Sequence, residues 1–374
     1  MKLAILQENL EKSIALASRF TSSRTQLPIL GNILLRASKT KLLIASTNLE
    51  ISVSDAIGAK VEEEGEIAVP SKTFSELVSN LPKETVNLKS EKEQLNISTS
   101  SFSSTVLGMN TSDFPKIPAS VNKEKSISLP KTIFSNALSK VLFAVSSDET
   151  RPILTGVLFT FNKKGLTLVA TDGFRLSLVK TNQLMNKSTN YQFVVPRTIL
   201  FEIGRVSEDE ILLEFREKDK QVVFGVGDTV FSSRLLEGTF PDWEKIIPKT
   251  SSYKVTVDKE DLLRAVKLAS IFARDNANIV KLIIDKEQVI IKAESSAAGR
   301  QETKIEVKTE GFDPELAEGP FEIAFNYKFF EDFINSVSGE EIVMQFSETD
   351  KPGVFLDPSS PDYLHLIMPV KIQG

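Results

Sequence analysis

Cysteine is absent from this chain of 374 residues, and histidine occurs once. The lack of cysteine excludes disulfides, thiolate metal sites and cysteine nucleophiles, and it fits a reducing compartment without proving one. Because histidine is the commonest general base and metal ligand near neutral pH, a single copy leaves little room for either chemistry. His365 lies in an alternating run, residues 363–368, which favours a plain strand residue over a catalytic one.

Long apolar runs and nucleotide-binding motifs are also missing. The first residues have too short an apolar stretch for a signal peptide, and no later segment approaches the ~18 apolar residues of a membrane span. We therefore expect a cytoplasmic protein with no membrane partner. No G-x-x-x-x-G-K-S/T loop occurs, and Gly225-Val226-Gly227 lacks the third glycine of a dinucleotide site. We expect no cofactor and no metal.

The chain does contain one pattern three times, at a spacing of about a third of its length. Residues 151–159 echo residues 26–34, with Pro152 lying 124 positions after Pro28. A more distant third copy, without the prolines, begins at 279–284. A period this long exceeds the ~20 to 50 residues of solenoid units, so it predicts a domain with its own core for each copy. We expect domains at 1–123, 124–250 and 251–374.

Each copy carries two helical stripes separated by runs of strands. An example is the i, i+3, i+4, i+7 set of Phe74, Leu77, Val78 and Leu81. Alternating runs on both sides of Asp172-Gly173 predict a hairpin, because glycine accepts positive φ at a tight turn. The predicted class is α+β, with helices on one face of antiparallel sheets. The expected helices are 8–20, 71–81, 131–146, 197–206, 259–274 and 327–337.

The net charge of −5 is unevenly distributed. The six expected helices hold 12 Lys and Arg against 8 Asp and Glu, whereas the rest of the chain holds 33 against 42. An excess of this size also occurs by chance, but most of the cations lie off the apolar stripes. If that helical face meets DNA, they can contact phosphates with little base specificity. These cations are Lys12, Arg19, Lys72, Lys131, Lys140, Arg197, Arg205, Arg264 and Lys267, together with Arg24 shortly after the first expected helix.

Over its whole length the chain resembles the bacterial DNA sliding clamp, the beta subunit of DNA polymerase III. The motifs that carry the resemblance are Leu27-Pro28-Ile29-Leu30-Gly31-Asn32, Val169-Ala170-Thr171-Asp172-Gly173-Phe174-Arg175-Leu176, Val195-Pro196-Arg197, Phe240-Pro241-Asp242-Trp243 and Met368-Pro369-Val370.

The resemblance implies three repeated clamp-type domains in each subunit and a head-to-tail dimeric ring around duplex DNA. The implied function is a DNA polymerase processivity factor without enzymatic activity. A basic hole would attract phosphates loosely while an acidic exterior repels stray DNA. The implied partners are double-stranded DNA, a second copy as homodimer, the DNA polymerase III alpha subunit, clamp-loader subunits and other replication or repair proteins that bind through short peptide motifs.

The resemblance also implies a peptide-binding pocket between the second and third domains. Apolar sub-sites would give affinity, Arg175 would fix direction, and Met368 would adapt its shape. Phe174 and Ala277 depart from the residues that relatives often carry, so the motif preference is open. Read from the residues alone, the same set could be domain-junction core. The pocket residues are Leu154, Thr171, Gly173, Phe174, Arg175, Leu176, Pro241, Lys245, Ile246, Asn326, Met368, Pro369 and Val370.

Two further sets follow from the resemblance. Arg24, Arg151, Arg197, Lys12 and Lys72 are the candidates for DNA contact. The dimer interface is expected to use Phe102 on an edge strand, Ile271 and Phe272 at a helix end, and Glu302 and Glu306 as ion-pair partners.

Two alternatives to the clamp stay open at this point. One is an adaptor that binds peptides but never encircles DNA. The other is an enzyme with paired carboxylates around Asp172 and Asp242, which is disfavoured because Asp172 already has a sufficient role in its turn and no spacing fixes a second acid near it.

Overall fold

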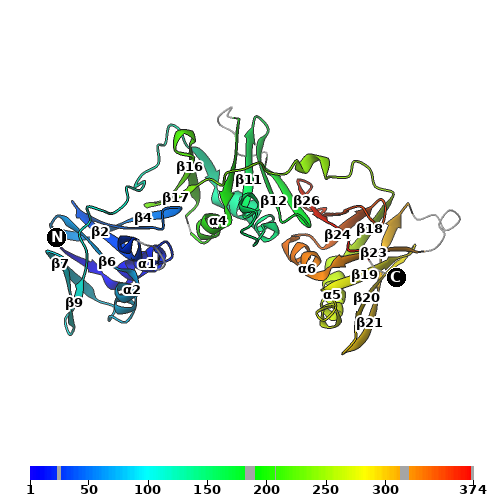
Figure 1. Cartoon of the computed structure of the whole chain (residues 1–374), viewed down its shortest axis with the longest axis horizontal. Coiled ribbons are helices and arrows are strands. Elements are labelled where there is room, and N and C mark those ends of the chain that lie inside the picture. Colours follow the sequence, from blue (N-terminus) through cyan, green and yellow to red (C-terminus); the bar gives the residue numbers. More distant parts are fainter. Residues whose placement is uncertain (23–26, 182–189, 207, 312–319, 372–374) are drawn as a thin grey trace. The chain divides into compact units, whose positions relative to one another are not determined.

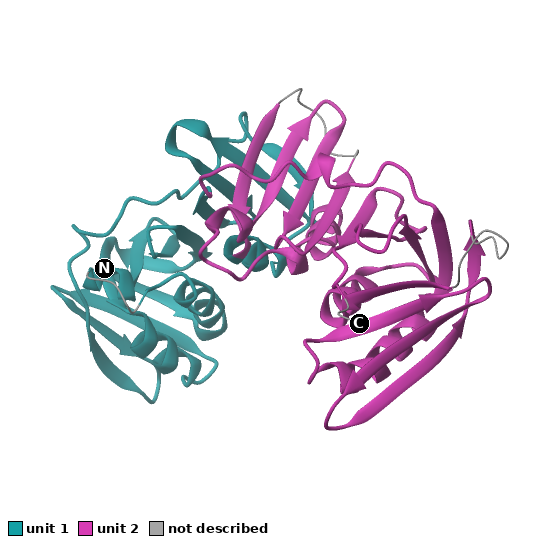
Figure 2. Ribbon diagram, turned by 45° about the vertical axis from the view of Figure 1, so that its right-hand side comes forward, with its two compact units in different colours: residues 1–131, 198–235 teal, residues 132–197, 236–374 magenta. Residues whose placement is uncertain are grey.

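The computed structural model describes residues 1–22, 27–181, 190–206, 208–311 and 320–371. Arg24, a candidate for DNA contact, lies outside this part of the chain. The chain divides into two compact units, coloured separately in Figure 2. Unit 1 contains residues 1–131 and 198–235, and unit 2 contains residues 132–197 and 236–374.

Unit 1 is built on two antiparallel sheets, as the α+β prediction requires. One has the strand order β5-β1-β7-β8-β9, and the other has the order β10-β15-β16-β17-β4-β3-β2-β6. The strands are β1 (Lys2–Leu6), β2 (Asn32–Ser38), β3 (Lys41–Thr47), β4 (Ile51–Gly58), β5 (Lys60–Glu63), β6 (Gly65–Pro70), β7 (Thr85–Glu91), β8 (Gln94–Ser98), β9 (Ser103–Leu107), β10 (Ile127–Pro130), β15 (Glu210–Arg216), β16 (Gln221–Val226) and β17 (Thr229–Arg234).

Unit 2 repeats the arrangement with a nine-stranded sheet, order β14-β11-β12-β13-β26-β25-β24-β18-β22, and a four-stranded sheet, order β21-β20-β19-β23 (Figure 1). Its strands are β11 (Gly156–Asn162), β12 (Gly165–Thr171), β13 (Arg175–Thr181), β14 (Tyr191–Pro196), β18 (Tyr253–Asp258), β19 (Ile279–Ile284), β20 (Gln288–Ser295), β21 (Gly299–Glu306), β22 (Lys308–Glu310), β23 (Phe321–Asn326), β24 (Glu341–Phe346), β25 (Gly353–Leu356) and β26 (Tyr363–Ile367).

Each large sheet is continuous across an expected domain boundary, because β17 pairs with β4 and β26 pairs with β13. This continuity explains why the compact units do not coincide with the three sequence repeats. The boundaries at 123 and 250 stay predictions.

All six expected α-helices are present, and each ends somewhat earlier than predicted. Their apolar stripes are buried; in the first helix Leu10, Ile14 and Ala17 have almost no exposed surface. The third helix departs most from expectation, since it stops at Ser139 and residues 142–144 form a separate 3-10 turn. None of the described helices has the length and apolar character that a membrane span requires. The helices are α1 (Gln7–Ser18), α2 (Ser71–Ser79), α3 (Lys131–Ser139), α4 (Arg197–Gly204), α5 (Lys259–Ala273) and α6 (Tyr327–Ser336).

The sequence repeat is also a repeat of hydrogen bonds. In unit 1 the amide of Arg234 donates to the carbonyl of Glu50 at 2.8 Å, and in unit 2 the amide of Met368 donates to the carbonyl of Phe174 at 2.8 Å. These two bonds extend the β17–β4 and β26–β13 ladders by one step. The segment after β26 thus pairs with the residue just before β13 in the same way as the end of β17 pairs with the residue just before β4.

Candidate functional site

The loop between β12 and β13, residues 171–175, forms a tight turn that we call the Asp172 turn. The Thr171 hydroxyl accepts from the amide of Gly173 at 3.0 Å and donates to the carbonyl of Arg175 at 2.6 Å. Asp172 Oδ1 accepts from the amides of Phe174 at 2.9 Å and Arg175 at 3.0 Å. Gly173 has φ +94°, where a side chain is strained. The turn fixes its own backbone, and Phe174 at its tip is 60% exposed.

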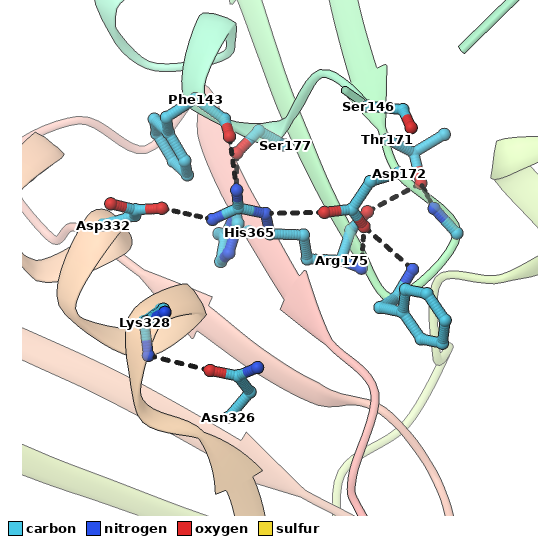
Figure 3. Close-up of polar contacts among 12 residues, drawn as sticks. Phe143, Ser146, Thr171, Asp172, Arg175, Ser177, Asn326, Lys328, Asp332 and His365 are labelled. Carbon is cyan, nitrogen blue, oxygen red and sulfur yellow. Dashed lines mark hydrogen bonds and ion pairs between the residues drawn. The ribbon is translucent and has the colours of Figure 1, made fainter. Parts of the chain in front are cut away.

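Arg175 closes this turn and points its side chain inward (Figure 3). Its Nε donates to Asp172 Oδ2 at 3.0 Å, Nη1 to Asp332 Oδ2 at 2.5 Å, and Nη2 to the carbonyl of Phe143 at 2.5 Å. The guanidinium carbon lies 4.5 Å from the ring centre of Phe329 and 5.5 Å from that of Phe143. The side chain is only 9% exposed. The buried guanidinium of Arg175 therefore donates hydrogen bonds to three acceptors inside the protein.

His365 lies behind the turn on β26, so the prediction of a strand residue is confirmed. It is fully buried, with Nδ1 2.6 Å from the Ser177 hydroxyl and its ring stacked on Phe333 at 5.3 Å. Burial, and secondarily the charge of Arg175, hold the pKa of His365 well below its usual range. The imidazole is therefore neutral, which suits packing rather than proton transfer.

The segment after β26 brings Met368, Pro369 and Val370 to the turn. Met368 is bonded to the Phe174 carbonyl, as described above, and the amide of Val370 donates to the carbonyl of Ala324 on β23 at 2.8 Å. The structure thus places Met368 beside the Asp172 turn, with exposed Phe174 and Met368 joined by a backbone hydrogen bond. Asn326, two residues beyond Ala324, caps α6 by accepting from the amide of Lys328 at 3.0 Å.

A hydrophobic cluster lies beneath these segments. Its buried members include Leu176 and Leu366, which face each other across the β13–β26 pair. Phe240, Trp243 and Ile247 pack against the cluster from residues 240–247. The pocket residues predicted in that stretch are thereby held near the turn, and Leu154 is buried at the end of a 3-10 turn, residues 152–154.

Residues 245 and 246 face solvent within that stretch. The Lys245 ammonium pairs with Asp242 at 2.7 Å, and the pair is largely exposed. Ile246 is also exposed. Asp242 and Asp172 each have a partner of their own, Lys245 and Arg175, and this arrangement gives no support to a catalytic pair of carboxylates.

The described cations proposed to contact DNA are exposed in both units. Lys12 and Lys72 lie on α1 and α2 of unit 1, and Arg151 and Arg197 lie in unit 2. Arg151 also lies close to the Asp172 turn, which the sequence did not predict. A Cβ added to Gly173 would be 3.4 Å from Arg151 Nη1, so this guanidinium lies beside the Asp172 turn.

Lys140 contradicts the sequence expectation for the helical cations. It is buried, its ammonium donates to the Ser360 hydroxyl at 2.6 Å, and it lies 5.2 Å from the ring centre of Tyr363. Desolvation lowers its pKa. The helix ends at Ser139, which places Lys140 outside the helical register on which the expectation rested.

The predicted interface residues lie beside or on the free edges of the two small sheets, β9 and β21, or on the helix α5 that packs against β21. Phe102 is exposed and directly precedes β9, rather than lying within it, and Glu302 and Glu306 lie on β21. Ile271 is 55% exposed at the end of α5, which packs on β20 and β21. Phe272 beside it is half-buried.

Two details of these edges were not predicted. Leu107 at the end of β9 is 69% exposed, more than Phe102. Glu302 already pairs with Lys292 of the neighbouring strand at 2.9 Å, and this ion pair lowers its pKa. A signal for Leu107 exists in the sequence, because it follows buried Val106 in an alternating run.

Comparisons with known proteins agree with this architecture. Models of the DNA polymerase III beta subunit match three successive segments: its N-terminal domain at residues 1–118, its central domain at 128–242 and its C-terminal domain at 244–371. The beta sliding clamp of Synechococcus elongatus is 30% identical over 100% of both chains, and that of Bacillus subtilis is 30% identical over 99% of this chain and 100% of its own.

The chain belongs to the DNA polymerase III beta subunit family, the beta sliding clamps. Among solved structures, the B. subtilis sliding clamp has a TM-score of 0.93 at 28% identity, and the Thermotoga maritima beta subunit has 0.89 at 26%, each covering 100% of both chains. The α+β fold with three clamp domains is confirmed. The expected function, a polymerase processivity factor, is confirmed as well, and the adaptor alternative is not favoured.

Proposed function

We propose that this cytoplasmic protein works without catalysis, as a ring of two copies that encircles duplex DNA and holds its polymerase through the Asp172 turn. Retention by linkage rather than by tight contact would let the ring slide while the polymerase stays on its template. Opening the ring would need a separate loader that uses ATP. One observation carries the docking part: Phe174 and Met368 are exposed apolar side chains on backbone that hydrogen bonds hold rigid.

The docking site fits a short peptide with aliphatic and aromatic anchors. Phe174 and Met368 offer apolar surface above the cluster that contains Leu176, and Ile246 adds more. Rigid aromatic and adaptable thioether groups are what peptide pockets use for affinity. The full proposed set is the one predicted from the sequence, with Leu154, Thr171, Gly173, Pro241, Lys245, Asn326, Pro369 and Val370 around these anchors.

The free sheet edges support the ring. Unpaired edges such as β9 and β21 invite pairing, and a head-to-tail dimer would satisfy both in each copy. Leu107 and Phe102 on one edge, and Ile271 near the other, supply apolar contact area. We propose that these residues, with Phe272, Glu302 and Glu306, form the contact between two copies.

The proposed DNA contacts are weak and non-specific. The exposed amines and guanidiniums of Lys12, Lys72, Arg151 and Arg197 would meet phosphates and release counterions. Arg24 is proposed with them from the sequence alone. Since a sliding contact must not hold a fixed register, few strong bonds are needed.

Retention on circular DNA tests the ring. Clamps loaded onto a nicked circular plasmid should stay bound through gel filtration at high salt, and linearising the plasmid should release them. Equal loss from circular and linear DNA would contradict topological binding. Charge reversal of Lys12 or Lys72 should slow loading while leaving retention on the circle intact.

Peptide titration tests the docking site. A fluorescein-labelled peptide with leucine and phenylalanine anchors should bind the wild type. Phe174→Ala should weaken binding by roughly 30-fold or more, since anchor residues contribute about 2 kcal/mol or more. Phe201→Ala is the matched control, because Phe201 is an exposed phenylalanine in unit 1. Equal binding by both variants would reject the site.

A further inference from the structure

We propose that Asp332 is a positioning residue for peptide docking. Acting through Arg175, it holds the Asp172 turn in the shape that presents Phe174. This inference rests on the proposed function, since it concerns how the same docking site is kept ready. It also gives Arg175, a member of the proposed docking set, a role inside the protein.

The three acceptors of Arg175 come from three parts of unit 2 (Figure 3). Asp172 belongs to the turn itself, and Phe143 follows α3. Asp332 belongs to α6 and lies 157 positions after Arg175. It is the acidic partner that comes from outside the turn. The guanidinium fork thus connects the turn to a helix of the third repeat.

The two carboxylate oxygens of Asp172 show how the connection reaches Phe174. Oδ1 accepts the amides of Phe174 and Arg175, and Oδ2 accepts Nε of Arg175. A hydrogen bond from a fixed guanidinium to one oxygen restrains rotation of the carboxylate. The other oxygen therefore stays oriented toward the two amides. The orientation of Asp172, and with it the turn, depends on where the guanidinium lies.

Asp332 decides where the guanidinium lies. The side chain of Arg175 is almost excluded from solvent and lies against the rings of Phe143 and Phe329. A buried charge that loses an acidic partner keeps its desolvation cost without the attraction that offset it. The guanidinium would then shift toward solvent or toward Asp172, and either shift disturbs the carboxylate that holds the amide of Phe174.

The side chain of Asp332 also suits a supporting role by its position. It is 43% exposed, so replacing it leaves no cavity. It lies on α6, whereas the exposed apolar groups of the site lie on the turn, after β26 and at Ile246. Removing its charge should therefore change the geometry of the turn more than the stability of the unit.

The test uses the full chain and the same labelled peptide with leucine and phenylalanine anchors. Asp332→Asn should weaken binding by about tenfold, a change equal to one logarithmic unit of Kd. Asp332→Glu, which restores the charge, should recover most of the affinity. Glu331→Gln is the matched control, because it removes one negative charge from the adjacent position of α6 and should bind like the wild type.

Hydrogen exchange at the Phe174 and Arg175 amides separates positioning from general destabilisation. Measured below the melting temperature of each variant, exchange at these two amides should accelerate in Asp332→Asn and stay unchanged in Glu331→Gln. Wild-type affinity and unchanged exchange in Asp332→Asn would overturn the inference while leaving the docking site intact. No peptide binding by the wild type would instead overturn the proposed function.

Discussion

The chain contains two versions of the same turn, one in each unit, and only their side chains distinguish them. In unit 1 the Asn48 turn, residues 47–51, repeats the Asp172 turn bond for bond. The Thr47 hydroxyl accepts from the Leu49 amide at 3.0 Å and donates to the Ile51 carbonyl at 2.8 Å. Asn48 Oδ1 accepts from the amides of Glu50 at 3.0 Å and Ile51 at 2.9 Å. The backbone design is shared.

Four successive side chains differ, and the first of them is Asn48 in one turn and Asp172 in the other. The Asn48 turn has Leu49, Glu50 and Ile51, whereas the Asp172 turn has Gly173, Phe174 and Arg175. Ile51 is buried and apolar, whereas the Arg175 side chain donates to Asp172 of the turn and to Asp332 of α6. Glu50 offers a charge where Phe174 offers a ring. The repeat therefore provides a rigid hairpin twice, and our proposal is that docking depends on the apolar tip and the internal ion pair of the Asp172 turn.

The largest effect should come from giving the second turn the tip of the first. Phe174→Glu replaces an exposed ring by a carboxylate, so an apolar peptide anchor loses its contact and meets a desolvated charge. We expect peptide affinity to fall by about 100-fold, or about 2.7 kcal/mol. Titration with the labelled peptide measures it, and Glu50→Gln in the other turn should bind as the wild type. An affinity of Phe174→Glu within twofold of the wild-type value would show that Phe174 does not contact the peptide.

The next effect concerns Gly173. Gly173→Leu copies Leu49 into a backbone with φ +94° and adds a Cβ close to Arg151. Left-handed backbone costs a non-glycine residue about 1–2 kcal/mol, and Leu49 at φ +77° shows that a turn of this type can bear that cost. Thermal melting should show unit 2 destabilised. An unchanged melting temperature would mean that the two turns tolerate side chains equally.

A pH effect should separate the strands behind the two turns. Unit 1 pairs Phe231 with Val53 at the register where unit 2 pairs His365 with Ser177. Folded His365 stays neutral, whereas the unfolded chain binds a proton below its ordinary pKa of 6.5, so stability falls as pH decreases through that value. One pH unit below it, the loss is about 1.4 kcal/mol.

Melting at pH 5.5 and pH 7.5 checks this effect. Because the sequence has one histidine, the double variant Ser177→Val with His365→Phe, which copies unit 1, should lose most of the difference. A wild type whose melting temperature is equal at both pH values would contradict a neutral buried imidazole.

The smallest effect should come from relieving strain in the first turn. Leu49→Gly removes a half-exposed side chain from a left-handed backbone position, and the gain of about 1–2 kcal/mol is partly offset by the greater chain entropy of glycine. We expect a net stabilisation of about 0.5 kcal/mol in chemical denaturation. A loss of stability would show that Leu49 packs more than its exposure suggests.

Local chemistry was predictable from the sequence wherever it acts over a few residues. The helical stripes, the glycine turn and the strand at His365 all follow from periodicity and φ preferences, and the threefold pattern indicates the repeat. The partners of Arg175 could not be predicted, because Asp332 and Phe143 come from distant segments with no spacing that points to them. The prediction that Lys140 is an exposed helical cation was wrong for a related reason. The helix α3 ends at Ser139, whereas the prediction assumed that the helix continues past Lys140.

The proposed pocket could be predicted only through the resemblance. Its residues come from five segments of the chain, and each segment alone is typical of ordinary core or surface. The Asp172 turn and residues 368–370 are brought together by the pairing of β13 with β26, a long-range contact that no local pattern specifies.

Hydrogen exchange of the clamp with and without a bound peptide tests the central claim most directly, because one molecule contains both turns. Peptide should slow exchange of the amides of residues 173–176, Met368 and Val370, and leave the amides of residues 49–52 unchanged. Equal protection of the Asn48 turn, or no protection near Phe174 and Met368, would contradict the account.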